Sequence, residues 1–310
     1  ILSWVSSDAK EVELPAFIAD DVASGQVSTV EWLKMYDGLL GMVMKLSPQM
    51  GMMANMYLAG FEQQNGFKIR DDFFGSLDGA NFQVSDSDGK TQSEVMGFKI
   101  KNADKLGTAL KGIQNALGSM GFAAFEESDY LGYKLNTLKA SGGGSGDTAA
   151  PEIAYVSTGK YLLIGSGKLD ALRKVLGRMK DPSGGSIWET PRAQAQIALL
   201  PKGFNGLGVS DSRNTISTVV NATETVSKQA ATQKKSATKK KGPGKGPAKG
   251  GDDDAKPADA AGDALAKIVD SKNRPSDATF QKYFGTMMSA SYSHPDALHL
   301  QMLATPVEAK

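Results

Sequence analysis

The segment whose spacing comes nearest to a ligand-binding motif is Gly-Ser-Gly-Lys-Leu at 165–169, which lies between an expected strand and an expected helix. A phosphate-binding loop has this context. It also needs a glycine five residues before its Gly-Lys pair, to approach the phosphates, and a hydroxyl residue after the lysine, to ligate Mg²⁺. Leu162 and Leu169 occupy those two positions. The pattern therefore predicts an ordinary helix start capped by Ser166 rather than a nucleotide site.

The sequence Asp-Ser-Asp-Gly-Lys at 86–90 begins like a calcium-binding loop. When Asp86 is counted as position one, the central glycine falls at Thr91 and the bidentate glutamate at Gly97, so both requirements are missing. An Asp-Gly pair between two alternating apolar segments is instead typical of a β-hairpin turn. We expect a turn here and no calcium site.

The other residue types used in catalysis and metal binding also fail to form a recognisable site. The chain has no cysteine, which excludes disulfides, thiolate zinc sites, iron–sulfur clusters and cysteine nucleophiles. Its two histidines, His294 and His299, flank an expected turn and are expected to be exposed to solvent. Ser7 and Lys10 fit a Ser-x-x-Lys pattern without its companion motifs. We assign no catalytic, cofactor-binding or metal-ligating residue, expect no cofactor, and favour a non-enzymatic protein.

Methionines are concentrated in one short segment, because six of the 13 lie within residues 42–56. Thioethers bind copper(I), and flexible methionine-rich surfaces bind varied protein partners. Packing between helices and copper binding are the alternatives to a partner surface. The candidate surface for a protein partner consists of Met42, Met50, Met53 and Met56.

A lysine-rich tract is the most conspicuous compositional feature. Residues 228–249 contain eight lysines with no arginine or aromatic residue, and five aspartates follow within residues 252–263. Lysine alone gives nonspecific attraction to phosphate, whereas base recognition and stacking depend on arginine and aromatic side chains. We interpret the tract as a solvated loop, and nucleic acid is not an expected partner. The candidate contacts for weak polyanion binding are Lys234, Lys235, Lys239, Lys240 and Lys241.

The overall charge and hydropathy exclude two further classes of partner. The formal net charge is +1, so no global attraction to nucleic acid or to an anionic membrane is expected. No apolar run approaches the roughly 20 residues that span a bilayer, and we expect no membrane span in this segment. The chain begins at Ile1 rather than Met, which is compatible with removal of a signal peptide or of a longer N-terminal region.

Helix and strand signals alternate along the chain. Ser-Thr-Val-Glu at 28–31 has the form of a capping box and predicts a helix start, and Ser47-Pro48 predicts the junction with a second helix. Alternating apolar residues at 96–100 predict a strand, followed by a helix capped by Asn102. This order predicts an α+β fold: an antiparallel sheet with helices packed mainly on one face, preceded by a helical methionine-rich region.

We expect residues 1–69 to form the helical N-terminal region and residues 70–310 to form the sheet domain. Residues 228–263 are expected to be a disordered insertion within that domain, rich first in Lys, Gly and Pro and then in Asp, because they contain almost no large apolar side chain. The helix and hairpin expected after this insertion are too small to fold alone. They should therefore complete the sheet that begins before it.

Five segments occur in an order that resembles one group of proteins. They lie at 15–43, 71–82, 97–113, 161–176 and 278–301 and include "DDFFGSLDGANF" and "YLLIGSGKLDALRKVL". The order resembles the large exported proteins of environmental bacteria that carry a domain of unknown function, of which this chain would be the C-terminal half. The resemblance implies an α+β fold and an extracytoplasmic location. It implies no site residues.

We therefore expect a non-enzymatic protein, exported or associated with the cell envelope, that acts in protein interaction or scaffolding through the apolar surface of its N-terminal helices. The first alternative is an extracytoplasmic protein that binds a small ligand, or an enzyme, with its site between sheet and helices. The second is weak polyanion binding through residues 228–249.

Overall fold

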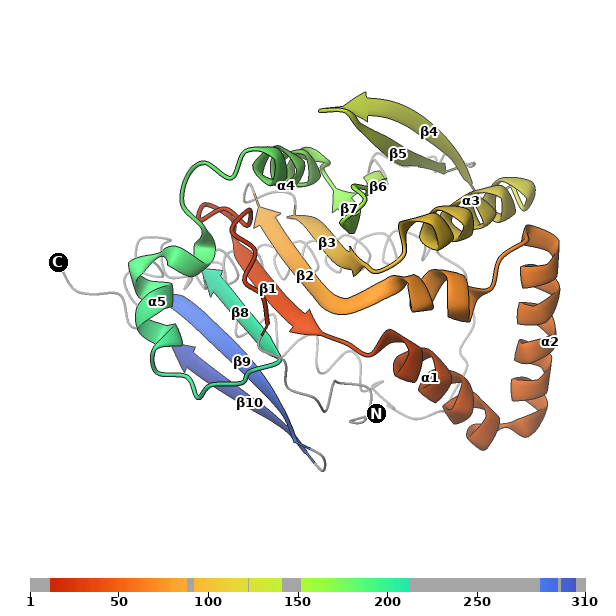
Figure 1. Cartoon of the computed structure of the whole chain (residues 1–310), viewed down its shortest axis with the longest axis horizontal. Helices are drawn as coiled ribbons and strands as arrows, with labels where there is room; N and C mark the ends of the chain where they lie inside the picture. Colours follow the sequence, from red (N-terminus) through yellow and green to blue (C-terminus); the bar gives the residue numbers. More distant parts are fainter. Residues whose placement is uncertain are drawn as a thin grey trace, which may run out of the picture. The chain divides into compact units, whose positions relative to one another are not determined.

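The structure is a computed structural model that describes residues 12–87, 92–121, 123–140, 152–211, 285–294 and 297–304. Within these residues, ten strands form one antiparallel sheet in the order β10-β9-β8-β1-β2-β3-β7-β6-β5-β4 (Figure 1). They belong to one compact unit, residues 1–211 and 286–304. The strands are β1 (Ser24–Thr29), β2 (Leu77–Ser87), β3 (Gln92–Ile100), β4 (Ala123–Tyr130), β5 (Tyr133–Ala140), β6 (Glu152–Ser157), β7 (Tyr161–Gly167), β8 (Gly206–Asp211), β9 (Thr286–His294) and β10 (Ala297–Ala304).

Helices connect and cover these strands, so the expected α+β class with an antiparallel sheet is confirmed. The first two helices are joined by a single residue, Ser47, and precede a short π-helix. The helical elements are α1 (Trp32–Leu46), α2 (Pro48–Asn65), η2 (Ile69–Phe73), η3 (Phe74–Ser76), α3 (Ala103–Ser119), α4 (Asp170–Lys180), η4 (Ile187–Glu189) and α5 (Pro191–Ile197).

The hairpin formed by β9 and β10 joins the same sheet as the earlier strands. β9 pairs antiparallel with β8, and Asp211 and Thr286 are direct partners in that register. The chain therefore leaves the sheet after Asp211 and re-enters it at the neighbouring position. Most of the intervening segment, with the lysine tract and the expected insertion at 228–263, lies outside the described residues. The division into 1–69 and 70–310 stays a prediction.

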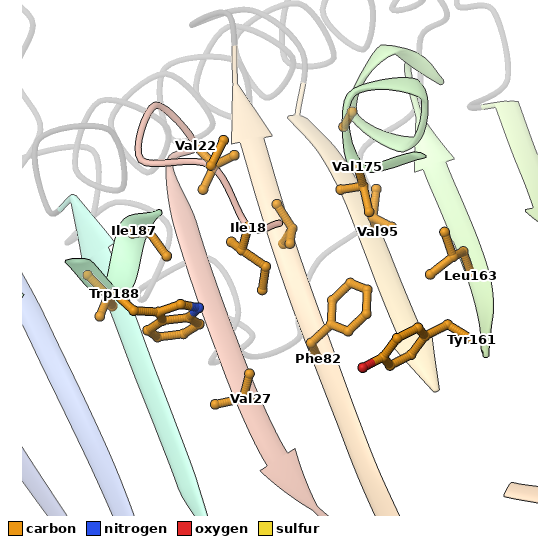
Figure 2. Close-up of a cluster of buried hydrophobic side chains, with 14 of the residues drawn as sticks. Ile18, Val22, Val27, Phe82, Val95, Tyr161, Leu163, Val175, Ile187 and Trp188 are labelled. Carbon is orange, nitrogen blue, oxygen red and sulfur yellow. The ribbon is translucent and has the colours of Figure 1, made fainter. Parts of the chain in front are cut away.

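One face of the sheet is covered by α4, α5, η4 and the segment before β1. Every second residue of a strand points to this face, for example Val27 of β1, Phe82 of β2 and Leu163 of β7. Ile18 and Trp188 pack against them (Figure 2). α4 contributes Leu172, which is fully buried. Because each large apolar side chain buried this way stabilises the fold by about 1.5–3 kcal/mol, this cluster is the main core. Its other fully buried strand members include Val84, Val95, Val156, Leu207 and Met288.

The opposite face carries a second, smaller cluster beneath α3 and the start of α1. Leu162, the neighbour of Leu163 in β7, points here and packs with Leu106 of α3. Trp32 of α1 meets Phe98 of β3 edge to face, with ring centroids 5.4 Å apart. The helices are thus divided between the two faces rather than gathered on one, because β3, β6 and β7 carry apolar residues at successive positions and bury both sides.

Two of the expected helix starts are confirmed at the level of single hydrogen bonds. The Ser47 hydroxyl accepts from the Met50 N–H at 3.4 Å, with Pro48 as the first helical residue of α2. The Asn102 side chain accepts from the Lys105 N–H at 3.1 Å at the start of α3. Each side chain satisfies a backbone donor that has no partner inside its own helix.

Two other expected caps are wrong, and the sheet is the reason in both cases. Ser28 lies in β1, within the region expected to be helical, and its hydroxyl donates to Asn81 Oδ1 at 2.8 Å. Helix α1 begins four residues later, with Glu31 at the N-cap and no side-chain cap. Ser166 lies in β7, and α4 begins at Asp170. Strand pairing on both sides of β1 and β7 outweighs the local capping signal.

Candidate interaction surface

Helices α1 and α2 form an antiparallel hairpin with a very close approach near its turn. A methyl group added at Gly51 would lie 2.8 Å from Met44 Cγ and 2.9 Å from Met44 Cα, and closer still to its sulfur. Gly51 is also the one buried residue of α2. The backbones can pack this closely only because residue 51 has no side chain, so glycine fixes the geometry of the hairpin.

The base of α1 is fixed to the sheet domain by both apolar and polar contacts. The Trp32 Nε1–H donates to the Asp78 carbonyl at 3.0 Å. One turn further on, Asp37 accepts two hydrogen bonds from the Arg70 guanidinium, at 2.8 and 2.7 Å. These hydrogen bonds from Arg70 lower the pKa of Asp37. A bidentate contact of this kind orients both partners.

The base of α2 is held in the same way by η2 and α3. Phe61 packs edge to face on Phe67, with ring centroids 5.8 Å apart, and Phe67 lies directly against Gly112 of α3. The Glu62 carboxylate accepts the Ile69 N–H at 2.9 Å. Both helices are therefore anchored at the end of the hairpin remote from Ser47.

Beyond this base, the hairpin leaves many of its apolar side chains exposed to solvent. No residue of α1 is buried, although this helix consists largely of Leu, Met, Tyr, Trp and Val. Residues 38–61 contain a single charged residue, Lys45. Soluble proteins rarely expose contiguous apolar patches of this kind without a functional reason. The most exposed of these side chains are Leu46 (81%), Met56 (76%), Tyr57 (74%), Met50 (64%) and Met52 (59%).

The four methionines singled out in the sequence all lie on this surface, which we call the hairpin surface: the exposed apolar residues of α1 and α2. Met50 and Met53 are three positions apart on α2 and Met56 three further on, so they share one flank of that helix. Met42 belongs to α1 and is 37% exposed. The methionine count did not identify Leu46 or Tyr57, although the lack of charge in residues 38–61 points to them.

A depression of about 630 Å³ lies where the end of α2, η2 and the start of α3 meet. Several of its charged groups have partners within the fold: Glu62 accepts from Ile69, while Asp72 accepts the Lys68 N–H at 2.8 Å and lies 3.6 Å from Lys105 Nζ. These groups fix the base of the hairpin. They do not converge on a common point as the polar groups of a ligand site do.

The Gly-Ser-Gly-Lys-Leu segment has structural roles that account for its glycines. Gly165 lies against Leu172, where a methyl group would be 3.0 Å from Leu172 Cδ2. Gly167 has φ +86° and lies directly against the Gln92 carbonyl, so a side chain there would be both strained and obstructed. The Lys168 N–H donates to Ser93 Oγ at 3.2 Å. The loop is packed against β3 and α4, and this packing accounts for both glycines.

The remaining motifs also show no sign of a chemical site in the part of the chain described here. Ser87 pairs with Gln92 across a β2–β3 hairpin, as expected, while the Asp-Gly turn itself lies outside the described residues. His294 ends β9 and His299 lies in β10. No group of three His, Asp or Glu side chains among the described residues is placed to hold a metal ion. Ser7, Lys10 and the five candidate lysines of the tract fall outside those residues.

No described helix combines the length and the apolar character needed to cross a membrane.

Comparisons with known proteins assign no family. No protein-family model matches the chain, and no curated protein is significantly similar to it. A solved structure titled "Structure of crystal form I of TP0453" matches over 97% of this chain and 82% of that chain, with a TM-score of 0.39 and 9% sequence identity. At this level of similarity the match carries no argument about function.

Proposed function

We propose that this is a non-enzymatic interaction protein, in which the hairpin surface binds a protein partner. The observation that supports the proposal is the combination of a firmly anchored base with an apolar, almost uncharged end: α1 buries no residue, and residues 38–61 carry only Lys45. An exposed patch of this kind costs solubility unless something covers it.

The arrangement of α2 suits recognition by an apolar groove. Met50, Met53 and Tyr57 follow the i, i+3, i+7 spacing with which a helix inserts side chains into a groove, and they are 64%, 48% and 74% exposed. Methionine is flexible and polarisable, so it adapts to the shape of such a groove. Tyr57 adds an aromatic residue of the type that often dominates binding energy. With one charge nearby, we expect affinity to depend little on salt.

The location and the biological setting of this interaction are part of the proposal. An extracytoplasmic location, in the periplasm, in the cell envelope or outside the cell, rests on the sequence resemblance to large exported bacterial proteins. Scaffolding fits a sheet domain that carries the hairpin on a fixed base. The depression beside α2 does not favour the small-ligand or enzymatic alternative, because two of its carboxylates, Glu62 and Asp72, accept backbone hydrogen bonds within the fold.

A photo-crosslinking amino acid placed at Tyr57 tests the proposal in cells that express the chain. We expect a discrete adduct from position 57 and none from the matched control position, Leu199, which is also apolar, is 70% exposed and lies two residues after α5. The partner identified from the adduct is then purified. Its affinity is measured against the wild type and against a variant with Met50→Gln, Met53→Gln and Met56→Gln.

We expect the triple variant to bind at least about tenfold more weakly, since each buried interface anchor contributes about 1 kcal/mol or more. The Leu199→Gln control should bind like the wild type. Equal crosslinking from positions 57 and 199, or unchanged affinity of the triple variant, would contradict a role for the hairpin surface.

A further inference from the structure

The two edges of the sheet differ in how they are protected against pairing with another strand. The edge strand β4 carries Glu126, Glu127 and Asp129, and Lys134 of β5 lies 3.2 Å from Glu127 and 3.1 Å from Asp129. Charged side chains on an edge are a common device against edge-to-edge association. The other edge strand, β10 (Ala297–Ala304, ALHLQMLA), contains no Asp, Glu, Lys, Arg or Pro.

The backbone of β10 also presents free pairing capacity on the side remote from β9. The Thr29 N–H donates to the Asn205 carbonyl and the Asp211 N–H to the Ala23 carbonyl, both at 2.9 Å, which fixes the residues of β8 that bond to β1. Bonding direction alternates along an antiparallel strand. Residues of β8 next to those that bond to β1 therefore bond to β9, and the same alternation continues through the β8–β9 and β9–β10 registers. As a result, the N–H and C=O groups of Leu300 and Met302 point away from β9.

Side chains at the same two positions leave apolar surface beside those backbone groups. Leu300 is 64% exposed and Met302 is 58% exposed. In the register they lie opposite Ser291 and Ser289, on the face of the sheet away from the main core. No described strand pairs with the outer side of β10.

We propose that β10 pairs antiparallel with β10 of a second copy of this chain, joining two sheets into one across a two-fold axis at Leu300. The segment is self-complementary in this register. Leu300 lies opposite its own counterpart and His299 lies opposite Gln301, so an apolar residue meets an apolar one and polar residues meet polar ones. Leu300 pairs with Leu300 through the outward backbone groups of both strands. The proposal is independent of the hairpin surface.

The expected dimer is of modest affinity. A two-strand contact of this length buries less than the roughly 1,200–2,000 Å² of a standard stable interface, and we expect a dissociation constant on the order of 1–100 µM. Sedimentation equilibrium of the full chain over this concentration range should show a reversible monomer–dimer equilibrium. A chain that stays monomeric throughout the range would overturn the proposal.

Single cysteines test the register directly, because the chain has none of its own. Opposed residues in a bonded antiparallel pair have Cα atoms about 5.5 Å apart, within reach of a disulfide. Leu300→Cys should therefore give a covalent dimer under mild oxidation. Met302→Cys should not, since residue 302 lies opposite 298 of the other copy. Equal crosslinking at both positions would indicate random collision and would overturn the proposed pairing.

A charge placed on each edge in turn separates this contact from other modes of association. Leu300→Lys should raise the dissociation constant at least about tenfold, because like charges would meet at the axis. Ser128→Lys, at an exposed position of β4, should leave it unchanged. Met53→Gln in the hairpin surface should also leave it unchanged. A dimer that survives Leu300→Lys, or is lost in Met53→Gln, would place the interface elsewhere.

Discussion

Helices α4 and α1 show how little the apolar content of a helix determines its burial. α4 has 11 residues and buries Ala171, Leu172, Val175 and Leu176 against the sheet. α1 has 15 residues, is richer in large apolar side chains, and buries none. α4 confines its apolar residues to one stripe, and that stripe meets a matching face of β3 and β7. α1 meets the sheet only at its first turns and then continues past it.

This difference separates two kinds of apolar surface in one chain. Removing side chains under α4 should destabilise the whole fold, whereas removing them from the end of the hairpin should affect binding alone. Substitutions where α1 and α2 contact each other should destabilise the protein by an intermediate amount.

The largest effect is expected for Leu172→Ala in α4. Leu172 is fully buried, and truncating such a residue removes transfer free energy and leaves a cavity, so the free energy of unfolding should fall by about 2–5 kcal/mol. Urea denaturation followed by circular dichroism measures the change. The matched variant Leu39→Ala, at a 42% exposed position of α1, should lose about 1 kcal/mol or less. If the two variants lost similar free energies of unfolding, α4 and α1 would not differ in their contribution to the stability of the fold.

A smaller and more local effect is expected for Gly51→Ala. The added methyl group would collide with Met44, including its backbone, and should separate the two helices at a cost of about 1–3 kcal/mol. Hydrogen exchange should accelerate in α1 and α2 and stay unchanged in the central strands. Gly60→Ala is the control, because nothing lies within 4 Å of a methyl group there. That variant should stabilise α2 by about 0.5–1 kcal/mol.

Alkaline pH should weaken the sheet domain through its tyrosines. Burial, with smaller effects of Glu13 and Asp78, raises the pKa of Tyr161 to about 12, and burial with Glu127 raises that of Tyr155 to about 12. An unfolded tyrosine ionises near 10, so between about pH 10 and 12 the folded state holds more protons than the unfolded one. The contribution of these tyrosines to the free energy of unfolding should be fully present below about pH 10 and should fall as the pH rises towards about 12.

Thermal melts from pH 8 to 12, with absorbance at 295 nm to follow ionisation, measure this effect. Tyr161→Phe should make the decline shallower. A decline identical to that of the wild type would show that Tyr161 does not contribute.

The smallest effect on stability is expected for the hairpin surface. Met53→Gln should change the free energy of unfolding by no more than about 0.5 kcal/mol, because Met53 is 48% exposed. The same denaturation experiment as for Leu172→Ala provides the measurement. A loss above 1 kcal/mol would mean that this side chain serves the fold rather than a partner.

Local signals in the sequence predicted elements best where no neighbouring strand competed for the same residues. Ser47-Pro48 and Asn102 begin helices as expected, since each lies between elements that do not need its backbone for a sheet. Ser28 has an equally good capping pattern, but β2 and β8 pair with its backbone on both sides. Those pairings join residues more than 50 positions apart in the sequence, and no local pattern contains them.

The candidate site shows a similar limit. The methionines at 42–56 were compatible with helix packing or with a partner surface, because both uses require the same apolar side chains. Exposure separates the two, and it depends on how far α1 continues beyond the sheet. The distribution of helices over both faces was likewise not predictable from alternation, since β7 is apolar at Leu162 and Leu163 alike.

The direct pairing of Asp211 with Thr286 has a consequence for how the chain tolerates changes in length. Two residues that face each other in adjacent antiparallel strands are the natural ends of a tight turn, and a few residues suffice to join them. Since the entropy of closing a loop grows only with the logarithm of its length, each doubling of the segment between these positions costs only about 0.6 kcal/mol. The junction is thus a site where sequence can be gained, lost or exchanged over generations at little cost to the fold.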